Sequence, residues 1–167
     1  MPLIKDGRLA SDPWIAVADD AELPATGAVV VSLTRFRAER EALLARGGPL
    51  GVRLKSSELA SEIGEDARHL GLIALEFSTF RDGRPYSTAR LLRERYGFAG
   101  ELRAVGDVLR DQFLFMHRCG FDALEVTEEK AVEAWRKAIS EFTVFYQAAT
   151  DGRAPMSALR WMKRAAE

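Results

Sequence analysis

Apolar and polar residues follow two alternating patterns along the chain, and these predict strands and helices in turn. Short apolar runs typical of buried strands begin near residues 28, 50, 72, 101 and 122. Between them, apolar residues recur every three or four positions, as on amphipathic helices. Strands that alternate with helices at this spacing indicate a parallel sheet with right-handed crossovers. We therefore expect an α/β fold with about five parallel strands, arranged as an open sheet or a partial (β/α) barrel, because a full barrel needs eight such units.

Capping residues and glycines set the predicted helix boundaries. Ser87 is expected to cap a helix over 88–96, and Thr127 to cap the longest helix, whose apolar stripe runs from Ala131 to Ala149. Three further helices are expected over 35–46, 57–70 and 108–119.

The first 27 residues differ from the regular part of the chain. Residues 3–10 predict a short hairpin, because Asp6-Gly7 suits a tight turn with positive φ. The lead-in that follows is broken by Pro13 and Pro24. We divide the chain into this lead-in (1–27), an α/β core (28–150) and a tail (151–167), within a single domain overall.

Composition limits the function classes. Hydrophobic residues make up 47% of the chain and charged residues 29%, a balance typical of globular proteins. A net charge of −1 argues against charge-driven binding to nucleic acid or to an anionic membrane. No apolar run approaches the roughly 20 residues of a membrane helix, and the N-terminus lacks a signal-peptide pattern. We expect a cytoplasmic protein that binds neither nucleic acid nor membrane.

The stretch from Phe80 to Asp107 contains six arginines and no lysine. The third strand-to-strand interval is longer than the others, and its extra residues lie in the loop 78–87. Loops that follow parallel strands carry the ligand site in α/β folds, and arginine binds oxyanions at two points. The predicted anion-binding residues are Arg81, Arg84, Ser87 and Arg103, with Asp107 as the candidate catalytic base. A phosphate, sulfate, sulfite or carboxylate would fit such a site.

Composition also offers a simpler explanation of these arginines. The whole chain has 19 arginines and 5 lysines, so each arginine at the surface can reflect this bias alone. For Arg81 and Arg84, an anion-binding role and a solvated surface position are equally supported. A solvated helix face is favoured for Arg90, Arg93 and Arg95. For Arg103, an internal ion pair is favoured over a ligand contact, and the candidate partners are Glu76, Glu101 and Asp107.

Other reactive residues do not form a recognisable catalytic or cofactor pattern. The sequence has no phosphate-binding loop, nucleophile elbow or dinucleotide fingerprint, so no cofactor is assigned. His69 and His117 lack a metal-ligand spacing, and no metal is expected. Cys119 fits a small buried residue, with a reactive thiol as the alternative. Trp161 and Met162 lie in a basic tail that could pack on this chain, on a second copy or on another protein.

Half of the chain resembles a known family. The segment "FSTFRDGRPYSTARLLRERYGFAGELRAVGDVLRDQFLFMHRCGFDALEV" and the start "LIKDG" closely resemble the bacterial domain-of-unknown-function family 934. Genes of this family commonly neighbour the gene of the sulfite reductase haemoprotein, and members are often labelled as oxidoreductases of sulfite reduction. The resemblance implies a role in sulfur assimilation, but it supplies no catalytic residues.

Two functions follow as expectations. The first is an auxiliary protein of assimilatory sulfite reduction that acts with sulfite reductase. The second is a small enzyme or binding protein for a sulfur oxyanion or a phosphate-bearing metabolite at the carboxyl ends of the strands. Possible partners are therefore sulfite reductase, an anionic small molecule and, through an open sheet edge or the tail, a second copy of the chain.

Overall fold

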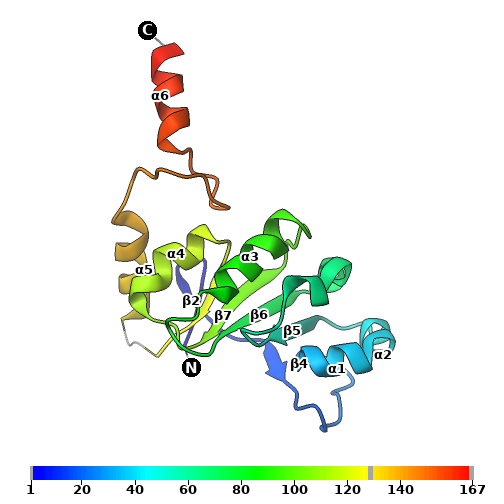
Figure 1. Ribbon diagram of the computed structural model, residues 1–167. Helices are drawn as coiled ribbons and strands as arrows, with labels where there is room; N and C mark the ends of the chain where they lie inside the picture. Colours follow the sequence, from blue (N-terminus) through cyan, green and yellow to red (C-terminus); the bar gives the residue numbers. More distant parts are fainter. Residues whose placement is uncertain (1, 128–129, 166–167) are drawn as a thin grey trace.

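A computed structural model describes residues 2–127 and 130–165, which form a curled sheet with helices on its outer side and one projecting helix (Figure 1). The strands are β1 (Leu3–Lys5), β2 (Arg8–Ala10), β3 (Trp14–Ala16), β4 (Ala28–Ser32), β5 (Leu50–Leu54), β6 (Leu72–Phe77), β7 (Glu101–Gly106) and β8 (Ala123–Glu125). The α-helices are α1 (Leu33–Ala38), α2 (Arg40–Ala45), α3 (Arg84–Glu94), α4 (Phe113–Arg118), α5 (Ala131–Ser140) and α6 (Met156–Ala165). Shorter 3-10 turns are η1 (Ala60–Glu62), η2 (Gly64–His69) and η3 (Arg110–Gln112).

The sheet confirms the predicted fold class. Its order is β2-β1-β8-β7-β6-β5-β4-β3, and the strands from β3 to β8 are parallel, each beside its neighbour in the chain. The predicted hairpin is also present, since β1 pairs antiparallel with β2 and then with β8. Asp6 and Gly7 form its turn with φ values of 49° and 73°, which is the conformation expected of a two-residue hairpin loop.

The short connection between the two edge strands requires a strong curl. A flat sheet of eight strands would separate its edges by about 34 Å. Only residues 11–13 connect β2 at one edge to β3 at the other, and they can span about 14 Å. The sheet therefore bends into a partial barrel with a helix-covered outer face and a concave inner face (Figure 1).

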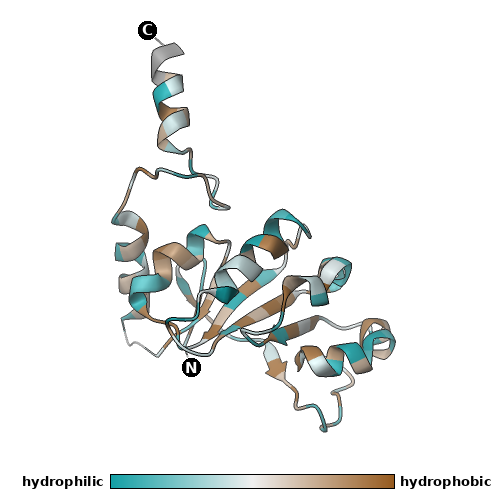
Figure 2. Cartoon of the chain, in the orientation of Figure 1, coloured by the Kyte–Doolittle hydropathy of each residue, from teal (hydrophilic) through white to brown (hydrophobic). Residues whose placement is uncertain are grey.

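Side chains alternate between these two faces. Outward-facing residues such as Val31, Val52, Ile73, Leu102 and Leu124 pack with helix residues in one core cluster. Inner-face residues are also buried, among them Leu72, Ala74, Arg103, Val105 and Ala123. Figure 2 shows the strands mainly in brown and much of the helix surface in teal, as expected for a sheet covered on its outer side.

The lead-in contains a sixth parallel strand that the sequence analysis missed. Residues 14–16 form β3, which pairs with β4 in the register Trp14↔Ala28. The apolar run 14–18 contains it, but Pro13 before this run and Pro24 after it favoured the interpretation as an irregular lead-in. No helix among the described residues is long and apolar enough to cross a bilayer.

Several predicted helices have different bounds. Residues 57–70 form the two 3-10 turns η1 and η2 rather than one α-helix, and the helix expected over 35–46 is interrupted at Glu39. The cap predicted at Ser87 is wrong, because α3 begins at Arg84 with Gly83 at its N-cap. Pro85 explains the early start, since proline fits the first helical turn.

The longest predicted helix is also shorter than expected. Instead of continuing to Ala149, α5 ends at Ser140, whose hydroxyl donates to the Arg136 and Lys137 carbonyls. Such back-bonding competes with regular helix structure. The expected start at 128–129 lies outside the described residues, and α5 begins at Ala131.

Candidate functional site

The loop after β6 lies over the carboxyl end of β7, as the site prediction required. Gly106 ends β7 with φ +91°, and a Cβ there would lie 2.5 Å from the Phe77 carbonyl oxygen. Only glycine permits both this φ and this approach. The loop is then held at Phe80, whose N–H donates to Asp107 at 2.8 Å and whose carbonyl accepts from Gln112 at 2.8 Å. In this structure, Asp107 therefore positions the loop.

Asp82 and Arg84 form a closed pair at the start of α3. The Asp82 carboxylate accepts from Arg84 Nε at 2.9 Å, from Nη2 at 2.6 Å and from the backbone N–H at 3.1 Å. Hydrogen bonds from the guanidinium hold the pKa of Asp82 well below its usual range. Arg84 Nη2 also lies 3.3 Å from Ser56 Oγ. The fork that would bind an oxyanion is therefore already engaged by a carboxylate of the same loop.

Arg81 and Ser87 complete the predicted loop site and lie at the surface. The guanidinium of Arg81 lies 5.4 Å from the centre of the Phe80 ring, and Arg81 has no ion pair among the described residues. Ser87 is exposed within α3 and caps nothing. The N-terminal donors of α3 are occupied by Asp82 and by the Gly83 carbonyl, to which Tyr86 donates at 3.3 Å.

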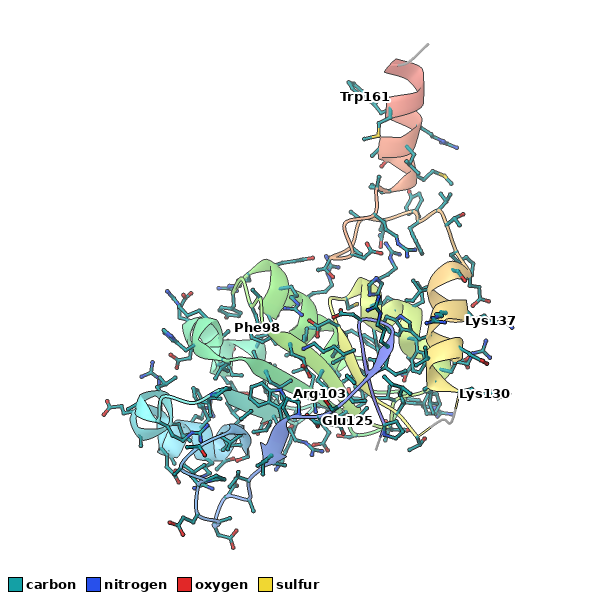
Figure 3. The ribbon with its side chains drawn as sticks, turned by 180° about the vertical axis from the view of Figure 1, so that it is seen from behind. Phe98, Arg103, Glu125, Lys130, Lys137 and Trp161 are labelled. Atoms are coloured by element: carbon teal, nitrogen blue, oxygen red, sulfur yellow. The ribbon has the colours of Figure 1, made fainter. Side chains whose placement is uncertain are left out.

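Arg103 is buried on the inner face and is bound by three carboxylates. Its guanidinium donates to both oxygens of Asp12 at 2.7 and 2.9 Å, to Glu101 at 2.8 Å and to Glu125 at 3.2 Å. Figure 3 shows Arg103 and Glu125 side by side. Lys5 pairs with the second oxygen of Glu101 at 2.8 Å. Burial alone would lower the pKa of Arg103, but the hydrogen bonds to Asp12 and Glu101 outweigh it and raise the pKa.

The sheet makes room for this guanidinium. Arg103 lies between Ala74 on β6 and Ala123 on β8 in the strand register, so two small side chains flank a large one. Asp12 belongs to the connection between β2 and β3, and its bond to Arg103 ties that connection to the middle of the sheet. The internal ion pair that the sequence favoured is therefore present, with Glu101 as one partner, while Glu76 pairs with Arg53.

Arg93 differs from the solvated residue that its sequence predicted. Its guanidinium donates to the carbonyls of Phe98, Gly100 and Gly120 at 2.6, 2.8 and 3.0 Å. It also pairs with Asp122 at 2.8 Å, and its side chain is 17% exposed. Arg93 thus joins the segments that lead into β7 and β8. Its partners follow it by 5 to 29 residues, so no local sequence signal revealed them.

The remaining candidates do not add a reactive group to the predicted site. Cys119 is buried, and burial raises the pKa of its thiol to about 11, which is the behaviour of a small core residue. Burial lowers the pKa of His117, which packs edge-on against Trp135 with 5.5 Å between ring centres. Among residues 2–127 and 130–165, no cluster of three His, Cys, Asp or Glu side chains has the arrangement of a metal site.

Together, the fold and these contacts define an α/β protein with a partial barrel and an internally paired arginine network. The profile of the family described as "Bacterial protein of unknown function (DUF934)" matches residues 51–157, which is more than half of the chain. The chain therefore belongs to the DUF934 family. No curated protein shows significant sequence similarity to it. The matched segment contains the carboxyl-end loop, Arg103 and α5, but almost none of α6.

Proposed function

We propose that this protein is an accessory protein that docks on sulfite reductase through helix α6. The observation that carries the proposal is the position of this helix, which projects away from the sheet and its covering helices (Figure 1). The identity of the partner rests on the family resemblance and its association with sulfite reduction. The expected role is to assist the reductase in assimilatory sulfite reduction.

The exposed side chains of α6 favour a protein contact. Trp161 is 77% exposed, Met162 63% and Leu159 41%, and at about 100° per residue Met162 lies between the other two around the helix. Arg160 lies on the other side. Exposed apolar groups that cluster are typical of interaction sites, and tryptophan, methionine and arginine are enriched in protein interfaces.

The base of α6 is anchored although the helix itself projects. Arg118 lies 3.8 Å from the centre of the Phe145 ring and bonds to Asp151 at 3.2 Å. Met156, the first residue of α6, donates its N–H to the Phe145 carbonyl at 2.7 Å. A helix fixed at one end and exposed along its length can present its apolar side to a partner at small cost in chain entropy.

The contacts described above give less support to the alternative function. Arg84 and Arg103 both bind carboxylates of this chain, and they share no contact partner. Binding of a sulfur oxyanion or a phosphate-bearing metabolite at the carboxyl ends of the strands stays a prediction, and Arg81 is its best remaining cation.

The docking proposal is tested by measuring the affinity of the full chain for purified sulfite reductase haemoprotein, for example by biolayer interferometry. Trp161→Ala and Met162→Ala should each weaken binding about tenfold or more, as truncation of a central interface residue does. Leu59→Ala is the matched control, because Leu59 lies outside α6 and is 61% exposed, close to the 63% of Met162.

Two results would contradict the docking proposal. One is the absence of binding to the reductase at micromolar concentrations. The other is an equal effect of Met162→Ala and Leu59→Ala. A dimer that dissociates on Trp161→Ala, measured by light scattering without reductase, would identify a second copy of the chain as the occupant instead.

A further inference from the structure

A cavity at the amino ends of the strands lies opposite the site that the sequence predicted. It has a volume of about 670 Å³ and is lined by the hairpin turn Asp6–Arg8, by α5 from Trp135 to Ser140, and by Phe142, Thr143 and Arg153. Figure 3 shows the hairpin strands and α5 on the same side of the molecule. This volume is within the range of small-molecule sites.

The polar lining of the cavity is predominantly cationic. Three arginines line it, Arg8, Arg136 and Arg153, together with one carboxylate, that of Asp6. Arg8 and Arg136 form no ion pair within the described part of the chain. Arg153 lies 3.8 Å from Asp151 and donates only long hydrogen bonds, of 3.4 and 3.5 Å, to backbone carbonyls. Cations that lack close carboxylate partners are available to an anionic ligand.

The cavity wall also contains a buried indole with an unused donor. Trp135 is 7% exposed, and its Nε1–H donates to no acceptor among residues 2–127 and 130–165. Nε1 is not among the buried side-chain atoms of the described residues that lack a partner, so this donor is open to solvent. The Nε1 edge faces Gly7, where a Cβ would lie 2.7 Å from Nε1, and Gly7 lines the same cavity. Glycine at this position lets the turn pack closely against the indole edge, where a side chain would clash.

The apolar part of the lining suits a planar group. Trp135, Ile139 and Phe142 line the cavity beside the arginines, and Phe142 is 56% exposed. Aromatic side chains stack on flat rings, while the hydroxyl of Thr143 can bond to polar substituents. The cavity therefore combines a cationic part, an apolar part and one free N–H donor.

We propose that this cavity binds a planar small molecule that carries a phosphate or sulfate group. Arg8, Arg136 and Arg153 would hold the anionic group by charge-assisted hydrogen bonds. The planar body would contact Ile139 and Phe142, and an acceptor atom on it would take the hydrogen bond of Trp135 Nε1. The proposal is independent of docking through α6, because none of these residues lies on that helix.

Titration of the full chain with adenosine monophosphate, adenosine, inorganic phosphate and inorganic sulfate tests this site. Calorimetry gives the affinity, and the part of the tryptophan fluorescence change that is lost in Trp135→Phe reports on Trp135, one of three tryptophans. Adenosine monophosphate should bind tightest among the four probes, since it supplies both the planar ring and the anion. Arg8→Gln and Arg136→Gln should each weaken this binding about tenfold, which corresponds to the loss of about 1.4 kcal/mol.

Two further variants separate the site from general charge effects. Arg110→Gln is the matched control, since Arg110 is exposed in η3 at the opposite end of the strands, and it should leave the affinity unchanged. Trp135→Phe keeps an aromatic ring but removes the N–H, and it should weaken adenosine monophosphate binding more than phosphate binding.

The possible results separate the parts of the proposal. An absence of binding by all four probes at 10 mM, or about the same loss in Arg136→Gln and Arg110→Gln, would overturn it. Binding of inorganic phosphate or sulfate as tight as that of adenosine monophosphate would overturn the planar part. Inorganic phosphate and sulfate compared with each other would show which of the two anionic groups is preferred.

Discussion

The two ends of the parallel strands use arginine in different ways. At the carboxyl ends, Arg84 is bound by Asp82 of the same loop. At the amino ends, Arg8 and Arg136 line a cavity and have no carboxylate partner within the described residues. Arginine is dense in the sequence near the first end and sparse near the second. A dense run of arginines therefore does not mark a free binding site when acids in the same run pair with the arginines.

Arg103, in the middle of the sheet, binds three carboxylates. Its substitution is expected to have the largest effect on stability. Arg103→Met should lower the free energy of unfolding by about 3–5 kcal/mol, because it leaves the buried Glu101 and two partly exposed carboxylates without their shared cation. Urea denaturation measures the loss. Arg90→Met is the control, since Arg90 pairs with Glu94 at the surface, where an ion pair contributes less than about 0.5 kcal/mol. Equal losses in the two variants would show that the network around Arg103 does not stabilise the fold.

The pH dependence of stability gives a second measure of the same network. The hydrogen bond from Arg103 lowers the pKa of Asp12 in the folded protein. This contribution to stability is present above the unfolded pKa of about 3.9 and is lost as the pH falls through the lower folded value. Arg103→Met should therefore reduce the acid sensitivity of unfolding between about pH 4 and that lower value.

Arg93 lies at the amino ends of β7 and β8, and its substitution tests whether the hydrogen bonds of a paired arginine there stabilise the fold. Arg93→Lys should lower the free energy of unfolding by about 2 kcal/mol, because one ammonium cannot replace the fork that bonds three carbonyls and Asp122. Denaturant unfolding measures this change. Arg95→Lys at the end of the same helix should change it little, since Arg95 is exposed and its guanidinium lies 5.7 Å from the centre of the Tyr96 ring. A similar result for both lysine variants would return Arg93 to the solvated surface that its sequence suggested.

The fold was predictable because its signals are local. All five predicted strands begin within one residue of their expected starts, because buried apolar runs determine them. The choice between an open sheet and a partial barrel stayed open, since it depends on β3 and on a connection of three residues. Helix ends were also harder to predict. Single residues decide them, as Pro85 does at the start of α3 and Ser140, through its hydrogen bond to the Arg136 carbonyl, at the end of α5.

The partners of the arginines were predictable only where they are near in sequence. Glu101 lies two residues from Arg103 and was proposed as a partner. Asp12 lies 91 residues away, and no pattern in one sequence connects them. The amino-end cavity has the same origin, because Arg8 and Arg136 meet only after the hairpin pairs with β8 and α5 packs beside it.

The smallest expected effect on stability concerns Arg84. The same variant also tests whether the carboxyl ends of the strands, rather than the amino ends, bind an anion. Arg84→Ala should leave the urea midpoint of unfolding without measurable change, since the Arg84 side chain is 62% exposed and an exposed ion pair contributes little. Sulfate or sulfite should raise the melting temperature equally in the wild type and in this variant if Asp82 already occupies the guanidinium. Asp82→Asn is the sharper variant, because it frees the fork of Arg84 and should give a larger rise in melting temperature with sulfate than the wild type shows. A sulfate response in the wild type that disappears in Arg84→Ala would instead show that the loop exchanges Asp82 for an anion. The carboxyl ends would then be a binding site in their own right, with Arg81 beside Arg84 as the next cation to substitute.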